Sequence, residues 1–232
     1  MDLDLLEFNN NLKTFQMIKN NWGSPGHGPD MNAEEKKTPT PVASAGGGDR
    51  VDVLGTKIFF YSSIEQDKIL DLNKNLHELS GKIIMRNMES TLGTKTFVDT
   101  PILLHIKSYG GSVFAGLAAM DTIQDIQKRV PIYTIVEGCS ASAGTFLSVV
   151  GTKRYMRRNA WMLIHQLSSG LWGKYAEIKD EVDNLDRLMD TIKGVYKEHT
   201  KVPVKELDKI LKRDIWWDAQ TCLKFGLIDE II

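Results

Sequence analysis

The segment GCSASAG at residues 138–144 lies between two apolar segments, residues 131–136 and 145–150. β-Branched residues in the first apolar segment predict a buried strand, and the small residues that follow allow a sharp turn into a helix. A strand-to-helix corner of this kind exposes the side chain of Ser142 and places the amide of Ala143 at the positive end of the helix. Ser142 is therefore a candidate nucleophile, although close packing alone would also explain the small residues.

The length and charge of the chain limit the classes of protein to which it can belong. Its 232 residues are enough for one sizeable α/β domain. The formal net charge of −1 argues against a nucleic-acid binder held by bulk electrostatics. No apolar run reaches the roughly 18 residues of a membrane-spanning helix, and the acidic start of the sequence is unlike a signal peptide. We therefore expect a cytoplasmic protein that binds neither nucleic acid nor a membrane.

Cysteine usage gives no sign of a metal site or a disulfide framework. Cys139 and Cys222 are the two cysteines, and they lack the spacing of metal ligands. We expect neither a metal nor a cofactor.

The first fifty residues differ in composition from the rest of the chain. Apolar residues occur near helical spacing in residues 1–20, and residues 20–50 are rich in Gly, Pro, Ser, Thr and charge. Such a segment buries too little apolar surface to offset its chain entropy. The sequence predicts a flexible arm over residues 1–50, with a propeptide, a partner-binding or pore-gating segment and a marginal helix as open roles, and an ordered domain over residues 51–232.

A second strand-to-helix corner precedes the first in the chain. Pro101–Ile106 predicts a strand buried on both faces, and Gly110 and Gly111 follow it before a helix begins at Val113. The two corners form a βαβ unit whose loops share the carboxyl edge of the sheet, where α/β proteins place their sites. The amide of Gly111 is a candidate oxyanion donor, because glycine permits the torsions that turn an N–H toward a ligand. A plain turn is the alternative.

The later part of the chain offers a base and a carboxylate. His165 follows the apolar segment 161–164, where a histidine is suitably placed as a general base, although a hydrogen-bonded edge residue is the alternative. Asp214 is a candidate to orient the imidazole, with Asp208 and Asp218 as rivals. Asp218 already has a role available as the cap of a helix at 219–225.

Helical periodicity predicts several amphipathic segments. The longest runs from about residue 172 to residue 199 and would span about 42 Å. A helix of this length either projects to meet a second copy of the chain or curves across its own sheet. The other predicted helices cover residues 63–80, ended by Gly81, and residues 204–211, which follow Pro203.

Together these residues indicate acyl-group hydrolysis. A serine hydroxyl is a poor nucleophile until an imidazole takes its proton, and a carboxylate fixes the tautomer of that imidazole. Ser142, His165 and Asp214 would supply these groups, and the amides of Gly111 and Ala143 would bind the oxyanion. Because the base must be neutral, activity should fall on acidification.

From Lys57 to the C-terminus the chain resembles the ClpP family, the proteolytic subunits of Clp proteases with a crotonase-like fold. The segments that carry the resemblance are residues 108–111, 115–116, 121–124, 138–144, 162–166, 212–214 and 225–229. The resemblance implies an α/β fold of stacked ββα units with a long protruding handle helix. It also implies a serine endopeptidase with Ser142, His165 and Asp214 as triad and Gly111 with Ala143 as oxyanion hole. The resemblance further implies a homo-oligomer of stacked rings around a chamber, with fourteen copies in all, and Arg213 would lie at a contact between rings.

The sequence departs from the family pattern at three places. Tyr109 replaces a usual proline before the glycine pair, and Leu167–Ser169 replaces a usual Pro-Leu-Gly after His165. In the family, an AAA+ unfoldase feeds unfolded polypeptide into the chamber, and its docking loops bind an apolar pocket on the ring. Leu103 and His105 would lie in that pocket, and Asp125 stands where an apolar residue is common, so docking of a standard unfoldase is not expected. Two other functions stay open, a non-catalytic ring subunit and a crotonase-fold enzyme that acts on acyl-thioesters.

Overall fold

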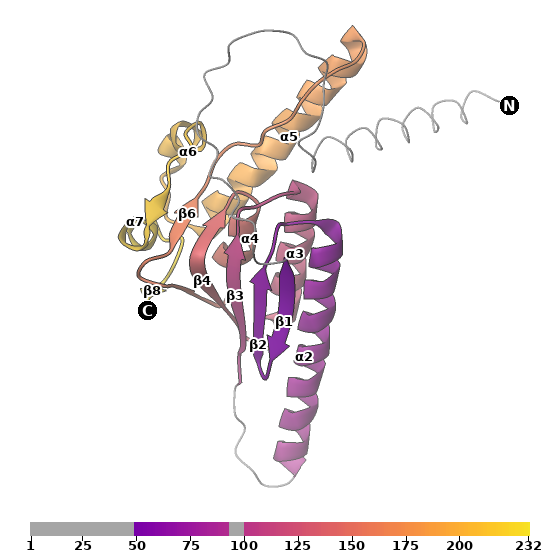
Figure 1. Cartoon of the computed structure of the whole chain (residues 1–232), viewed down its shortest axis with the longest axis vertical. Helices are drawn as coiled ribbons and strands as arrows, with labels where there is room; N and C mark the ends of the chain where they lie inside the picture. The colour runs from indigo at the N-terminus through magenta and orange to yellow at the C-terminus, as the bar shows by residue number, and fades with distance from the viewer. Residues whose placement is uncertain (1–48, 93–99) are drawn as a thin grey trace, which may run out of the picture. The chain divides into compact units, whose positions relative to one another are not determined.

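The computed structural model describes residues 49–92 and 100–232, and the described residues from Arg50 to Ile232 form one unit (Figure 1). The arm predicted for residues 1–50 lies outside the described residues except at its last two positions. The elements are β1 (Arg50–Leu54), β2 (Lys57–Tyr61), α2 (Gln66–Leu92), β3 (Ile102–Ser108), α3 (Val113–Ile126), β4 (Ile132–Ala141), α4 (Gly144–Val149), β5 (Lys153–Met156), β6 (Trp161–Leu163), α5 (Tyr175–His199), α6 (Val204–Leu211), β7 (Trp217–Asp218), α7 (Ala219–Lys224) and β8 (Glu230–Ile231).

One mixed sheet organises the described residues, and eight strands take part in it. Strands β1 and β2 form an antiparallel hairpin, and β2, β3, β4, β5 and β8 then follow side by side in parallel. Each parallel step needs a crossover, and α2 and α3 supply the first two. The sheet therefore has the βαβ order that the two corners predicted.

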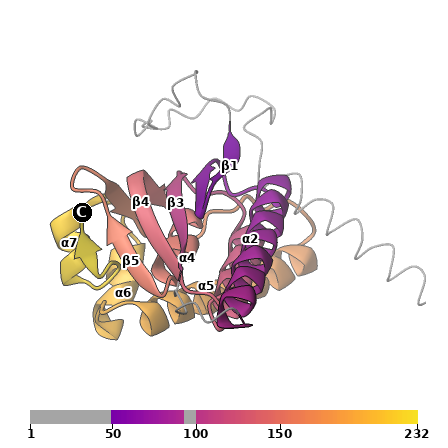
Figure 2. The same ribbon diagram turned by 90° about the horizontal axis from the view of Figure 1, so that it is seen from below.

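Helices cover one face of this sheet (Figure 2). Ile58 and Phe60 of β2 and Leu104 and Ile106 of β3 are fully buried, whereas Phe59, between the first two, is partly exposed. Because successive side chains of a strand point to opposite faces, this alternation identifies the helix-covered face as the core.

Helix α2 is longer than its sequence predicts. The predicted end at Gly81 is wrong, because the helix continues from Gln66 to Leu92. A Cβ at Gly81 would meet no atom within 4 Å, so the residue is an ordinary turn of an exposed helix face. Glycine in a helix interior costs only about 1 kcal/mol, which the packing of Leu72, Leu76 and Ile83 outweighs.

The predicted helix around residues 172–199 begins three residues later, at Tyr175. Its buried residues are Ile192, Val195 and Tyr196, all near its C-terminal end. Its first turns carry exposed apolar side chains at Tyr175, Ile178 and Val182. That this portion meets a second copy of the chain stays a prediction.

The two short helices near the C-terminus match their sequence signals. Helix α6 begins directly after Pro203, as predicted. Asp218 caps α7, since its Oδ1 accepts the amide of Thr221 at 2.8 Å. Gly226 follows that helix with φ of +67°, a conformation that favours glycine. Local capping chemistry was sufficient to predict both elements.

Arg154 joins the C-terminal elements to the sheet. From β5, its side chain donates to Asp229 Oδ1 at 2.5 Å and to Asp229 Oδ2 at 3.0 Å. It also donates to the carbonyls of His199 at 2.5 Å and Gly226 at 2.8 Å. The hydrogen bonds of Arg154 hold the pKa of Asp229 below its usual range, against the opposing effect of partial burial.

We predict that Arg154→Ala lowers the free energy of unfolding by about 2 kcal/mol, because it leaves two carbonyls and a carboxylate without their charged donor. Urea unfolding at neutral pH measures this loss. Asp229 has a lowered pKa in the folded state, so its contribution is present at neutral pH and is lost as the pH falls through that lowered pKa. The wild-type protein should therefore lose its advantage over the variant in acid.

Arg158→Ala is the matched control, since the Arg158 side chain is exposed and makes no hydrogen bond or ion pair within residues 49–92 and 100–232. Equal stabilities for wild type and Arg154→Ala would contradict the prediction.

Candidate active site

Ser142 lies at the corner between β4 and α4 in a strained backbone conformation. Among the described residues it is the one non-glycine residue with a positive φ, at 53°. Its amide donates to Leu163 O at 2.8 Å, and its carbonyl accepts the Thr145 amide at 2.9 Å and Thr145 Oγ1 at 2.6 Å. Left-handed torsions cost energy for a residue with a side chain, and they persist when surrounding bonds hold them. Such strain is typical of functional corners.

A buried tyrosine stabilises the corner at Ser142 through a hydrogen bond to Thr145. Tyr196 of α5 is fully buried, and its hydroxyl lies 2.7 Å from Thr145 Oγ1. Thr145 already uses its hydroxyl hydrogen toward the carbonyl of Ser142, so the tyrosine must be the donor. Burial raises the pKa of Tyr196 above its usual range, which keeps this donor protonated. The chain of bonds from Tyr196 through Thr145 fixes the position of Ser142.

The glycine turn after β3 packs directly against Ser142. Gly110 and Gly111 have φ of +96° and +148°. Ile64 holds the turn, because its amide donates to Gly110 O at 2.8 Å and its carbonyl accepts the Ser112 amide at 2.8 Å. A Cβ on Gly110 would lie 2.6 Å from Ser142 Cβ and 2.8 Å from the carbonyl oxygen of Ala141. The close approach of the two corners requires glycine at this position.

Two amides near Ser142 have no acceptor in the described part of the chain. They belong to Gly111 and Ala143, the two predicted oxyanion donors. Backbone amides that stay unpaired beside a candidate nucleophile are suited to bind a developing negative charge.

His165 and Asp214 lie together. His165 Nδ1 is 3.2 Å from Asp214 Oδ1, and the two side chains are 24% and 80% exposed. His165 follows the end of strand β6 by two residues. The Gln166 amide donates to Leu211 O at 2.7 Å, so the chain just after His165 is bonded to the end of α6. With Nδ1 turned to the carboxylate, Nε2 is left to face a reacting group.

The rivals of Asp214 have other partners. Asp208 lies 2.8 Å from Lys193 Nζ on α5, and Asp218 caps α7. Each of these carboxylates is held by its own contact.

The histidine and the serine lie at the ends of neighbouring strands. Strand β6 pairs with the last three residues of β4, with Leu163 opposite Ala141. Within residues 49–92 and 100–232 no hydrogen bond joins Ser142 Oγ to His165. Catalytic hydrogen bonds are often long in free enzymes and shorten when substrate binds.

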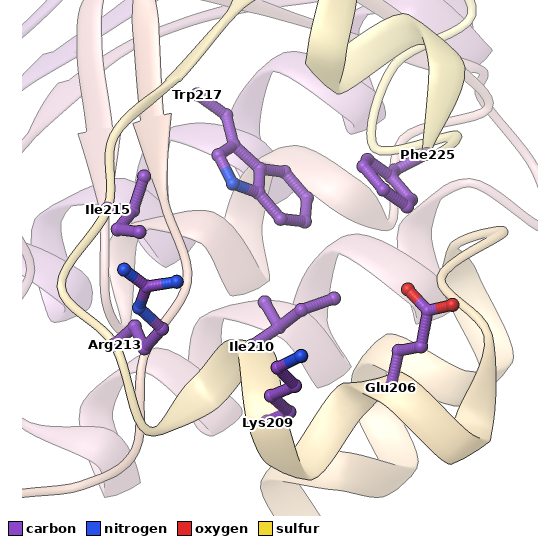
Figure 3. Close-up of a pocket in the computed structure, with 7 residues that line it drawn as sticks. All are labelled: Glu206, Lys209, Ile210, Arg213, Ile215, Trp217 and Phe225. Atoms are coloured by element: carbon purple, nitrogen blue, oxygen red, sulfur yellow. The ribbon is translucent and has the colours of Figure 1, made fainter.

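Arg213 lies on the other side of its segment from Asp214. It lines a cavity of about 460 Å³ with Glu206, Lys209, Ile210, Ile215, Trp217 and Phe225 (Figure 3). Its side chain makes no ion pair with another described residue. That Arg213 lies at a contact between rings stays a prediction.

Two contacts of the site were not predicted from the sequence. One is the Thr145–Tyr196 bond, and the other is an edge-to-face contact between Tyr109 and Trp216. Tyr109 stands beside the predicted glycine turn, but its partner Trp216 is 107 residues away and carries no local signal.

Neither a metal cluster nor a membrane span is found among the described residues. These residues contain no group of three or more His, Cys, Asp or Glu arranged to hold a metal ion. No described helix combines the length and the apolar character that crossing a bilayer requires.

A family model described as Clp protease matches residues 56–232. The chain belongs to the Clp protease family. ATP-dependent Clp protease proteolytic subunit 3 of Streptomyces coelicolor is 39% identical over 135 residues, which are 57% of this chain and 61% of that relative. Proteolytic subunit 1 of the same organism is 33% identical over 196 residues, which are 83% of this chain and 82% of that one.

A solved structure supports the same family. It is a mutant of ClpP1 from Listeria monocytogenes, with a TM-score of 0.61 and 26% identity, and the match covers 77% of this chain and 91% of that chain. The Clp protease match and this structure confirm the predicted α/β fold of the ClpP and crotonase type. The protruding handle helix and the flexible arm stay predictions.

We predict that Gly110→Ala destabilises this Clp protease family member by about 2 kcal/mol or more, because the new methyl group meets Ser142 at a positive φ. Urea unfolding measures the change. Gly170→Ala is the control, since a Cβ there meets no atom within 4 Å. If both variants are as stable as wild type, the close packing of the glycine turn on Ser142 is wrong.

Proposed function

We propose that this chain is a serine endopeptidase that cleaves unfolded polypeptides or peptides, with Ser142 as nucleophile, His165 as base and Asp214 as the residue that orients the base. The contact of 3.2 Å between His165 Nδ1 and Asp214 Oδ1 carries the proposal. It joins residues 49 positions apart and leaves the other ring nitrogen for proton transfer. Membership of the Clp protease family and the names of its relatives support it.

The proposed reaction proceeds in two halves. Ser142 Oγ attacks the peptide carbonyl carbon, and its proton passes to His165 Nε2. The amides of Gly111 and Ala143 bind the oxyanion. The C–N bond then breaks, and the departing amine takes the proton from His165. In the second half, water attacks the acyl-serine ester and gives a proton to His165, which returns it to Ser142 as the carboxylic acid leaves.

We also propose that the chain works as a homo-oligomer of stacked rings, with fourteen subunits by family resemblance. The exposed apolar residues at the start of α5, Tyr175, Ile178 and Val182, support an interface there. They share one face of the helix at spacings of three and four residues. Arg213 is proposed at a contact between rings, and its lack of an ion-pair partner among the described residues is compatible with an acidic partner on another copy.

The proposed partner is an AAA+ unfoldase, but a standard one should dock poorly. The predicted docking place lies on the helix-free face of the sheet, where the His105 ring stacks on Phe59 at 4.7 Å. Beside it, Glu137 accepts the hydroxyl of Tyr61 and Arg157 Nε. Burial and the bond to Glu137 raise the pKa of Tyr61 to about 12, so this phenol stays protonated. An apolar docking segment of an unfoldase would cover these polar and charged groups. It would remove their water without offering them hydrogen-bond partners, so its binding should be weak.

We predict that Ser142→Ala abolishes covalent labelling by a fluorophosphonate and lowers hydrolysis of a fluorogenic peptide by about a thousandfold or more. The reagent reacts only with an activated serine, and light scattering should show an unchanged particle mass. Ser140→Ala is the matched control, because Ser140 is buried two residues away and its Oγ has no hydrogen-bond partner in the described structure.

The outcomes separate the proposed function from its rivals. A wild-type assembly that is never labelled is a non-catalytic ring subunit. Turnover of a coenzyme A thioester that persists in Ser142→Ala identifies a thioester enzyme. Either result overturns the peptidase proposal.

A further inference from the structure

Two aromatic side chains meet between the glycine turn and the segment that carries Asp214. The rings of Tyr109 and Trp216 have centroids 6.4 Å apart and planes at 84°, which is an edge-to-face pair. Tyr109 immediately precedes Gly110, and Trp216 follows Asp214 by two residues. The pair therefore links the two pieces of backbone that flank Ser142 and His165.

The segment at residues 213–217 presents different side chains to its two sides. Arg213, Ile215 and Trp217 line the cavity beside α6 (Figure 3). Asp214 reaches His165, and Trp216 reaches Tyr109. This alternation is that of an extended chain, in which every second side chain points the same way. Trp216 is thus the neighbour of Asp214 on the side that faces the site.

The carboxylate of Asp214 needs an external constraint. Its side chain is 80% exposed, and within the described residues its one ion-pair or hydrogen-bond contact is with His165. An exposed carboxylate gains little from one such contact and is free to turn into water. Its position therefore depends on how firmly the backbone of the 213–217 segment is held.

That backbone is held from two sides. On the cavity side Trp217 stacks on Phe225, with centroids 4.7 Å apart, and pairs with Met162 of β6. On the site side the contact that the structure shows is Tyr109 against Trp216. The stack fixes the end of the segment, and the aromatic pair fixes the part nearest the carboxylate.

We infer that Tyr109 and Trp216 are positioning residues that hold Asp214 against His165 by tying the 213–217 segment to the glycine turn. This inference rests on the proposed peptidase function. The edge-to-face contact needs the ring of residue 109 and not its hydroxyl. The electrostatic interaction of that hydroxyl with Cys139 raises the pKa of Tyr109, and partial burial adds to the effect. Phenylalanine at this position keeps the ring contact with Trp216 and deletes only the hydroxyl.

The test uses the full chain and a fluorogenic peptide substrate. We expect Tyr109→Ala and, from the other side of the contact, Trp216→Ala to lower kcat roughly tenfold with KM changed less than about twofold, because positioning acts on the chemical step. Tyr109→Phe should retain wild-type kcat. Ile215→Ala is the matched control, since Ile215 lies between Asp214 and Trp216 but faces the cavity, and its kcat should also be unchanged.

A double-mutant cycle distinguishes positioning from a general loss of structure. In an Asp214→Asn background, Tyr109→Ala should cost less than about twofold in kcat, because the group that the pair positions is already gone. Particle mass and thermal midpoint for each variant show whether it is folded and assembled, and the two alanine variants give independent readings.

Four results would overturn the inference. The first is that Tyr109→Ala lowers kcat by the same factor in the wild-type and the Asp214→Asn backgrounds, and the second is a rise in KM with unchanged kcat. The third is a Tyr109→Phe variant as slow as Tyr109→Ala, and the fourth is wild-type kcat in both Tyr109→Ala and Trp216→Ala. The peptidase proposal survives each of these, because it depends on labelling and hydrolysis that disappear in Ser142→Ala.

Discussion

The left-handed conformation of Ser142 is the constraint on which the rest of the site depends. A residue with a side chain adopts φ of 53° only where its surroundings compensate the cost. Here Leu163 of β6 and Thr145 of α4 bind the backbone of this one residue, and Tyr196 of α5 acts on it through Thr145. The glycine turn packs against the remaining side of Ser142, because residue 110 has no Cβ to clash with the Ser142 side chain. Disturbing any of these contacts would move the hydroxyl.

The bend of β4 explains how the histidine reaches this corner. Strand β4 pairs with β5 over Tyr133–Val136 and with β6 over Cys139–Ala141. Gly138, between these two stretches, has φ of +69°, so the strand changes direction where its partner changes. Strand β6 can therefore pair with the last three residues of β4. His165 and Ser142 consequently leave neighbouring strand ends on the same edge of the sheet.

Local signals predicted the parts of this site, and long-range contacts assembled them. The corner at 138–144, the glycine turn and the caps at Pro203 and Asp218 depend on residues within a few positions of one another, so the sequence contains their signals. Gly81 misled the prediction of α2, because tertiary packing outweighs a single weak propensity. Preferring Asp214 over Asp208 and Asp218 required the family resemblance. The physical reason for this preference is that the two rivals have other partners: Lys193 pairs with Asp208, and the Thr221 amide donates to Asp218.

Register in the 213–217 segment couples the cavity to the candidate site. A shift of one residue along an extended chain exchanges the side chains on its two faces. Such a shift here would turn Arg213 and Ile215 toward His165 and would send Asp214 into the cavity. A one-residue shift breaks both the Trp217–Phe225 stack and the Tyr109–Trp216 pair, and at most one of the two contacts could form again with the neighbouring tryptophan. Two aromatic contacts on opposite faces, one at Trp216 and one at Trp217, thus specify which residue meets the imidazole, although neither ring belongs to the proposed triad.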